Sequence, residues 1–140
     1  MPQAFLPTKP VLTLEAAKRI AAAAHAEAGV NHWNMAICIV DDGGHVIYME
    51  RMDGTQFGSS NIAREKAAAA MRFKRPTKAM EDAVVGGRLV VMTLPGAVPL
   101  EGGIPIVVDG DYVGAIGVSG GTSVQDGQVA EAGAKAVEPG

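Results

Sequence analysis

A glycine-rich turn late in the chain has the residue types of an anion-binding site. The segment Ser119 to Thr122 (Ser-Gly-Gly-Thr) follows an apolar strand-like run and precedes a helical pattern that begins near Ser123. Backbone N–H groups at such a turn point outward and add to the positive end of the helix, which suits a carboxylate or a phosphate. The spacing matches neither a P-loop nor a dinucleotide-binding fingerprint. The alternative interpretation is a strand-to-helix turn that needs glycine only for its backbone geometry.

The same segment contains the letters of a hydrolase nucleophile motif. Gly117, Ser119 and Gly121 reproduce the Gly-x-Ser-x-Gly spacing. That motif works on a strand–turn–helix of a parallel sheet, with an acid and then a histidine further along the chain. No histidine follows Ser119. We therefore do not expect serine hydrolase chemistry.

Lys66 lies on the apolar face of a predicted helix, beside Ala69 and Phe73. A lysine in such a position either extends its ammonium group to the surface or directs it into a pocket, where it pairs with an anion. Burial beside Asp53 or Glu65 in a cleft would favour an enzyme in which Lys66 or Asp53 is the acid/base. Exposure of Lys66 would weaken both site hypotheses.

The three histidines offer a single candidate ligand. His25, His32 and His45 have no metal-binding partner three or four positions further along the chain, and no His/Cys cluster exists, so we expect no zinc site. One histidine is enough to ligate a haem iron. His25 is the best placed, because it lies at the edge of an Ala-rich helix face. The alternative for each histidine is a solvated side chain.

Composition limits the class of protein. The 140 residues suit one domain, and 48% of them are apolar. The net charge of −3 and the absence of a basic run argue against nucleic-acid binding. The single cysteine, Cys38, excludes an internal disulfide and is interpreted as a core residue. No signal sequence is present, and no apolar run approaches the roughly 20 residues that span a bilayer, so we expect a soluble cytoplasmic protein without a membrane partner.

The elements that must position these residues alternate as hairpins and helices. Residues 1–11 are predicted as an extended arm and 12–140 as a single domain. Thr13 is predicted to cap the first helix, Ser59 or Ser60 the second and Thr77 the third. We expect helices over 13–28, 60–74, 77–85 and 123–137 and strands over 35–40, 45–52 and 89–94, followed by a hairpin around Asp109-Gly110. This order favours an α+β layered domain with an antiparallel sheet of about five strands.

Several motifs occur in a fixed order along the chain. They are Asp41-x-Gly43-Gly44, Arg51-Met52-Asp53-Gly54, Ala63-x-x-Lys66-Ala67, Pro76-Thr77, Gly102-Gly103-Ile104-Pro105-Ile106, the run from Val113 to Gly121, and Gln125-Asp126. Together they resemble the GlcG/HbpS-like family, which includes the C-terminal domain of the PduO corrinoid adenosyltransferase. The resemblance covers about residues 12–137.

The resemblance implies a profilin-like α/β/α domain that forms homo-oligomers, as dimers, tetramers or octamers. It also implies haem as the leading ligand, since members are associated with haem binding and in some cases with haem degradation or redox sensing. Other members lie in catabolic gene clusters.

Three hypotheses follow. The first is a homo-oligomer that binds a small anionic ligand, with haem the leading candidate and His25 its axial ligand. The second is an enzyme acting on a small carboxylated or hydroxylated metabolite, without an organic cofactor and with Lys66 or Asp53 as the acid/base. The third is a structural or assembly role, in which the glycines only allow close subunit packing. The predicted ligand-binding residues are Arg51, Lys66, Gly102, Gly103, Ser119, Gly120 and Gly121.

Overall fold

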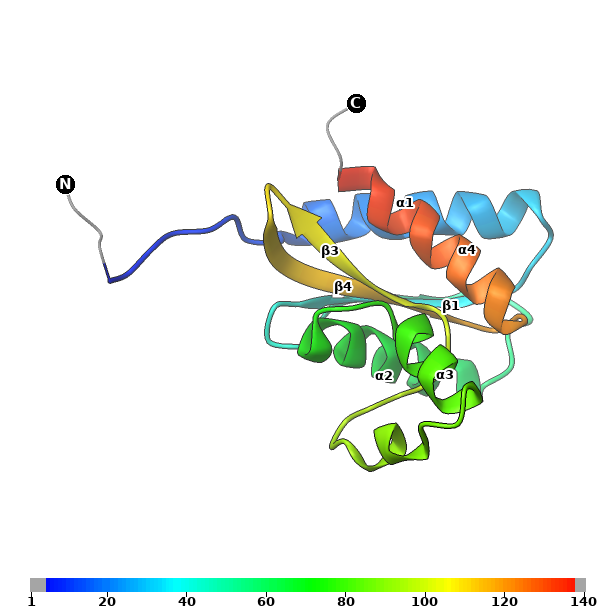
Figure 1. The fold of residues 1–140 in the computed structure, drawn as a ribbon. Helices are drawn as coiled ribbons and strands as arrows, with labels where there is room; N and C mark the ends of the chain where they lie inside the picture. The colour runs from blue at the N-terminus through cyan, green and yellow to red at the C-terminus, as the bar shows by residue number, and fades with distance from the viewer. Residues whose placement is uncertain (1–4, 138–140) are drawn as a thin grey trace.

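A four-stranded antiparallel sheet forms the middle layer of the domain. The computed structural model describes residues 5–137. Its strands are β1 (Ala36–Asp41), β2 (Val46–Arg51), β3 (Gly103–Val108) and β4 (Asp111–Ser119), in the order β2-β1-β4-β3. Helices α1 (Leu14–Val30) and α4 (Ser123–Ala134) cover one face, and α2 (Gly58–Phe73) and α3 (Thr77–Val85) lie on the other (Figure 1). The predicted α+β layered architecture is confirmed.

The central strands are buried on both faces. Side chains alternate along β1, so Ile37 and Ile39 contact the α1/α4 layer while Cys38 and Val40 contact α2. The facing helices present mainly alanine, which lets them pack close to the sheet. At Gly117 in β4 an added Cβ would overlap the backbone of α2, so the closest approach of helix and strand requires glycine there.

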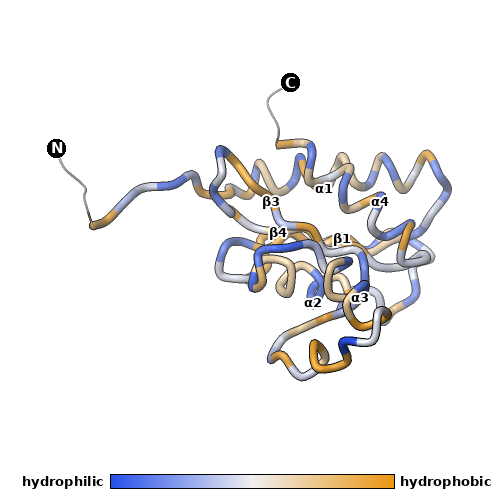
Figure 2. Tube along the Cα trace, viewed as in Figure 1, coloured by the Kyte–Doolittle hydropathy of each residue, from blue (hydrophilic) through white to orange (hydrophobic). Residues whose placement is uncertain are grey.

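The predicted strand over residues 89–94 is wrong. Leu89–Thr93 form a short 3-10 helix, η1, so the sheet in residues 5–137 has four strands rather than about five. The local sequence is rich in β-branched residues, but only Val91 is buried, against Ala69 and Met80. A helical turn is enough to bury this one side chain, and the other apolar side chains of η1 are exposed. The segment is the strongly hydrophobic part of the tube below α3 (Figure 2).

Two predicted helix caps are also wrong, while that of Thr13 is confirmed. Helix α2 begins at Gly58, and neither Ser59 nor Ser60 caps it; Ser59 is buried and accepts a hydrogen bond from Gln56 Nε2 at 3.0 Å. Pro76, not Thr77, precedes the first turn of α3. The Thr77 side chain instead accepts a hydrogen bond from Gly103, which is far away in the sequence.

The two ends of the described chain differ in structure. Residues 5–13 form no helix or strand and lead away from the body of the domain (Figure 1). At the other end α4 stops at Ala134 and a 3-10 turn, η2 (Lys135–Val137), follows. The predicted arm and domain extend to residues 1–4 and 138–140, which lie outside the described residues. In residues 5–137 the structure contains no helix with the length and apolarity needed to cross a membrane.

Candidate functional site

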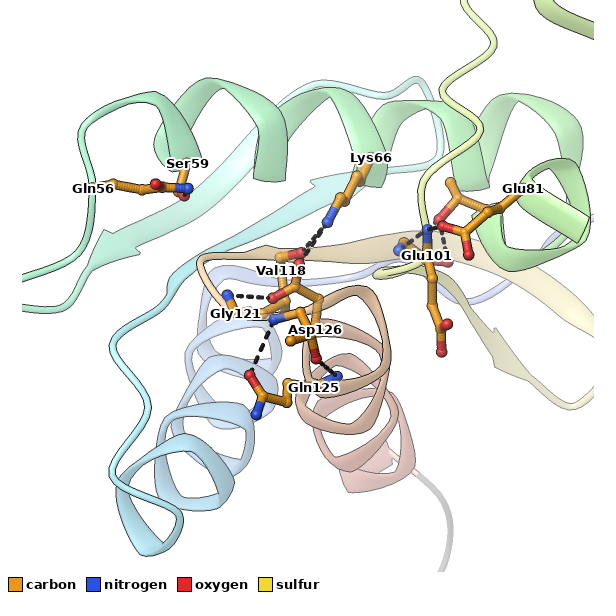
Figure 3. Close-up of polar contacts among 12 residues, drawn as sticks. Gln56, Ser59, Lys66, Glu81, Glu101, Val118, Gly121, Gln125 and Asp126 are labelled. Atoms are coloured by element: carbon orange, nitrogen blue, oxygen red, sulfur yellow. Dashed lines mark hydrogen bonds and ion pairs between the residues drawn. The ribbon is translucent and has the colours of Figure 1, made fainter. Parts of the chain in front are cut away.

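Lys66 and Asp126 form a buried ion pair beneath one end of the sheet. The Lys66 side chain is only 3% exposed, and its Nζ donates to Asp126 Oδ2 at 3.0 Å and to the Val118 carbonyl at 2.9 Å (Figure 3). Asp126 Oδ1 accepts a hydrogen bond from the Gly121 N–H at 2.9 Å. These contacts connect α2, β4 and α4. Lys66 is therefore buried, as one interpretation of its position required, but its partner is neither Asp53 nor Glu65.

Burial controls the electrostatics of this pair. Loss of solvent raises the pKa of the Asp126 carboxyl, and the nearby Lys66 ammonium and the Gly121 N–H oppose that change. Each charge therefore depends on the other for compensation. Two of the three Lys66 N–H groups are accounted for by Val118 and Asp126, so the ammonium is held in one place.

Two glycines allow the chain to pass directly over the ion pair. A Cβ at Gly102 would lie 2.8 Å from Lys66 Nζ and 2.6 Å from the Val118 oxygen, and the φ of Gly102 is +131°. A Cβ at Gly103 would overlap the Lys66 carbonyl. The Gly103 N–H donates to Thr77 Oγ1 at 2.9 Å, which is the long-range role of that threonine. Gly102 and Gly103 are thus required by close packing against the protein itself.

The opposite side of this glycine pair faces a cavity of about 690 Å³. Its walls come from α1, the start of α3, the start of β3 and the side of α4. Gly102 and Gly103 line it, so two of the predicted ligand-binding residues do reach an open site. Lys66 does not line the cavity, because the Gly102 backbone lies between the ammonium group and the open space.

The predicted anion-binding turn holds a carboxylate that belongs to the protein. Ser119 is buried, and Gly120, with φ +145°, packs against the backbone of Asn34 and Met35. The Gly121 N–H is bonded to Asp126. Thr122 and Gln125 then form a reciprocal capping box at the N-terminus of α4. It provides acceptors for the backbone N–H groups of both residues.

Arg51 and Asp53 lie apart from the ion pair. Arg51 ends β2, and its guanidinium lies 5.2 Å from the ring centroid of Phe57. Asp53 is exposed in the following turn. Within residues 5–137 no hydrogen bond or ion pair joins either side chain to Lys66. The predicted site residues therefore divide into separate groups.

His25 belongs to another polar cluster on the α1 side of the sheet. Its Nδ1 lies 2.6 Å from Glu50 Oε2, and Tyr48 Oη donates to Glu50 Oε1 at 3.2 Å. The His25 side chain is 52% exposed. Sequence reasoning missed Glu50, although Tyr48 and Glu50 are two positions apart on one strand and must share a face.

Comparison with known proteins places this arrangement in a family. The family model described as "Haem degrading protein HbpS-like" matches residues 12–135. This range includes the ion pair, His25 and the glycine wall, which consists of Gly102 and Gly103. The chain belongs to the HbpS-like family. The resemblance inferred from its sequence motifs is confirmed.

Relatives of this HbpS-like chain are similar along most of their length. Protein GlcG of Escherichia coli is 44% identical over 112 residues, which cover 80% of this chain and 84% of GlcG. A Citrobacter freundii protein described as an uncharacterized 15.0 kDa protein in the dhaT-dhaS intergenic region is 36% identical over 124 residues, covering 86% and 87% of the two chains.

Solved structures of HbpS-like proteins share the fold. A double mutant of Streptomyces reticuli HbpS superposes with a TM-score of 0.87 at 30% identity, covering 99% of this chain and 95% of that one. The crystal structure of the PduOC:Heme complex superposes with a TM-score of 0.83 at 27% identity, covering 94% of this chain and 98% of that one. The HbpS-like family therefore has a member whose structure contains haem.

Proposed function

We propose that this HbpS-like chain is a homo-oligomeric haem-binding protein in which His25 ligates the iron. The contact between His25 Nδ1 and Glu50 Oε2 carries the proposal. A carboxylate accepts hydrogen bonds, so this contact assigns a proton to Nδ1 and leaves Nε2 as the nitrogen that would ligate the iron. A carboxylate behind a ligating histidine fixes the orientation of the ring and strengthens it as a ligand.

The surroundings of His25 suit a flat ligand. Ala22 and Gly29, three positions before it and four after it on α1, are small and exposed. A Cβ added at Gly29 would have nothing within 4 Å. A large planar group can therefore approach the imidazole along the helix surface. Bound haem would supply a redox-active iron and a visible absorption band.

The relatives support the same ligand. One solved relative is the PduOC:Heme complex, and the family is described as haem-degrading. A haemin titration tests whether this chain binds the same ligand. Purified protein is titrated with haemin while the Soret band is recorded. We expect a saturable red shift for the wild type and its loss in His25→Ala.

A matched control separates iron ligation from nonspecific haemin adsorption. His45 is an exposed histidine in the turn between β1 and β2, and His45→Gln should titrate like the wild type. A wild-type protein that gives no saturable shift at micromolar haemin would overturn the haem proposal. An unchanged spectrum in His25→Ala would instead overturn the assignment of His25.

Exposed apolar side chains support the homo-oligomeric part of the proposal. Four side chains on and next to η1 are between 45% and 58% exposed. They are Leu89, Val90, Met92 and Leu94. A contiguous group of this kind is typical of a subunit interface. Sedimentation should show a dimer, tetramer or octamer, reduced in Val90→Asp and unchanged in Val30→Asp on α1. The expected cytoplasmic location stays a prediction.

The cavity beside Gly102 and Gly103 favours a second candidate, an enzyme acting on a small carboxylated or hydroxylated metabolite. A volume of about 690 Å³ is ample for such a molecule. Lys66 would need to move past Gly102 to act as the acid/base, and Asp53 is not among the residues that line the cavity. Structures of crystals soaked with small hydroxy acids would test this candidate, which requires density in the cavity.

A further inference from the structure

The lysines that line the α3/α4/β3 cavity are each paired with an acid. Lys78 donates to both carboxylate oxygens of Asp82, at 3.1 and 2.8 Å, and Lys135 lies 3.1 Å from Glu131. Behind the glycine wall, Lys66 is paired with Asp126. In the described residues, each lysine that lines the cavity therefore already has a carboxylate partner within the protein.

Three acids of the described chain line the cavity, and two of them have partners: Glu27 accepts from Gln128, and Glu131 pairs with Lys135. The third acid is Glu101. Its backbone N–H donates to Glu81 Oε1 at 2.9 Å, which fixes the loop before β3 to α3. Its own carboxylate makes no hydrogen bond and no ion pair with any residue in 5–137. The side chain extends alongside α4 in Figure 3. A partly buried carboxylate without a protein partner is costly, because nothing compensates the lost solvent.

Helix α4 leaves room for this carboxylate. Gly127 faces Glu101, and a Cβ added there would overlap Oε2 and lie 2.9 Å from Cδ as the side chain now lies. Glycine inside a helix is unfavourable relative to alanine. The glycine leaves a space that the Glu101 side chain occupies at the cavity wall.

Burial and nearby charges both act on the Glu101 carboxyl. Burial is the largest cause of its raised pKa. The Lys78 ammonium lowers that pKa, and the carboxylates of Glu81, Asp82 and Asp126 raise it. A cation placed in the cavity would compensate the burial and stabilise the ionised form of Glu101.

We propose that this cavity binds a small organic amine, whose ammonium group pairs with Glu101. Residues 5–137 contain no group of three or more potential ligands that could hold a metal ion, which favours an organic cation over a metal. Ile104, Val124 and Ala132 line the same cavity and offer apolar surface to the carbon chain of the amine. The site is independent of His25, so it goes beyond the haem proposal.

The first test uses three probes that share one carbon chain. Protein labelled with ¹⁵N is titrated with n-butylamine, n-butanol and butyrate near neutral pH, where the amine is protonated and butyrate is ionised. We expect saturable amide shifts at Gly102, Gly103 and Gly127 with n-butylamine alone. Equal shifts with butanol would mean apolar partition only, and a response to butyrate or to none of the probes would also overturn the proposal.

The second test removes the charge of Glu101. Glu101→Gln keeps the size of the side chain and should weaken n-butylamine binding about tenfold or more, since a charge-assisted pair is lost. Glu131→Gln is the matched control, because Glu131 lines the same cavity but is paired with Lys135. Unchanged affinity in a folded Glu101→Gln, or an equal loss in both variants, would contradict the assignment. Neither result bears on the haemin titration, so the two proposals can fail separately.

Discussion

Lys66 Nζ and Asp126 Oδ2 lie 3.0 Å apart although 60 positions separate the two residues in the sequence. Backbone groups contact this pair at three points: the Val118 carbonyl accepts from Lys66, the Gly121 N–H donates to Asp126, and Gly102 packs against Lys66 Nζ. A charged pair thus occupies a place where helix α2, strand β4 and helix α4 meet.

Removing one member of this pair should destabilise the fold strongly. Lys66→Met leaves Asp126 as an uncompensated buried charge, and Asp126→Asn leaves Lys66 in the same condition. Each single substitution is expected to lower the free energy of unfolding by about 3–5 kcal/mol, measured by urea denaturation. The double variant Lys66→Met/Asp126→Asn should lose clearly less than the sum of the two. Strict additivity would show that the two side chains are not coupled.

Gly102→Ala should cost more than the strain of its backbone conformation alone. Its Cβ would collide with the Val118 oxygen and with Lys66 Nζ, so we expect a loss of at least about 2 kcal/mol in unfolding free energy. Gly110→Ala is the matched control. Gly110 also has a positive φ, of +83°, but a Cβ there meets nothing within 4 Å, so only the backbone strain of about 1 kcal/mol is expected. Equal losses would contradict the packing role of Gly102.

The Cys38 thiol should be unreactive in the folded protein. Burial raises its pKa from 9.0 to about 11, while Arg64 slightly lowers it. Ellman's reagent at pH 8 should label Cys38 only after unfolding. Because the thiol ionises more easily in the unfolded chain, its contribution to stability is complete below about pH 9 and is lost as the pH rises through about 11. The decrease, about 2–3 kcal/mol in total, should be absent in Cys38→Ala. Rapid labelling of the native protein would contradict this prediction.

Glu50 should act on haem affinity through His25. Glu50→Gln keeps the length of the side chain but replaces the carboxylate that accepts from Nδ1. Loss of such a partner behind a metal ligand typically lowers affinity 10–100-fold, and the haemin titration should show a change of about that size. Tyr48→Phe removes only the hydrogen bond to Glu50 Oε1 and should have a smaller effect. A Glu50→Gln protein that binds haemin as tightly as the wild type would show that Glu50 does not support the ligand.

Local patterns predicted the layered fold because hairpins and helix faces are encoded in neighbouring residues. The apolar run of residues 35–40 and the Asp109-Gly110 turn each involve residues close in the sequence. The prediction for residues 89–94 was wrong because it also used local residues only. The β-branched residues of this run favour a strand, but its structure depended on which side chains are buried in the folded protein. The sequence could not show that burial of Val91 alone would be satisfied by η1.

The candidate site was harder to predict because its contacts are long-range. The position of Lys66 on an apolar helix face left both surface exposure and burial open. The structure buries the side chain, and nothing in its neighbourhood in the sequence pointed to Asp126. Glu101 and Glu50 were missed for a similar reason. Glu101 is of interest because its carboxylate has no partner in the described residues. Glu50, on strand β2, is of interest because it contacts His25 on helix α1.

The order of strands in the sheet has a consequence for synthesis of the protein. Strand β4 lies in the middle of the sheet, between β1 and β3, yet it begins only at Asp111. Asp126 follows it, so a nascent chain that ends before α4 leaves one face of β3 and β4 uncovered and cannot neutralise Lys66. The ribosome must therefore release nearly the whole chain before the domain can fold, and C-terminal truncations should yield unfolded or aggregated products rather than smaller domains.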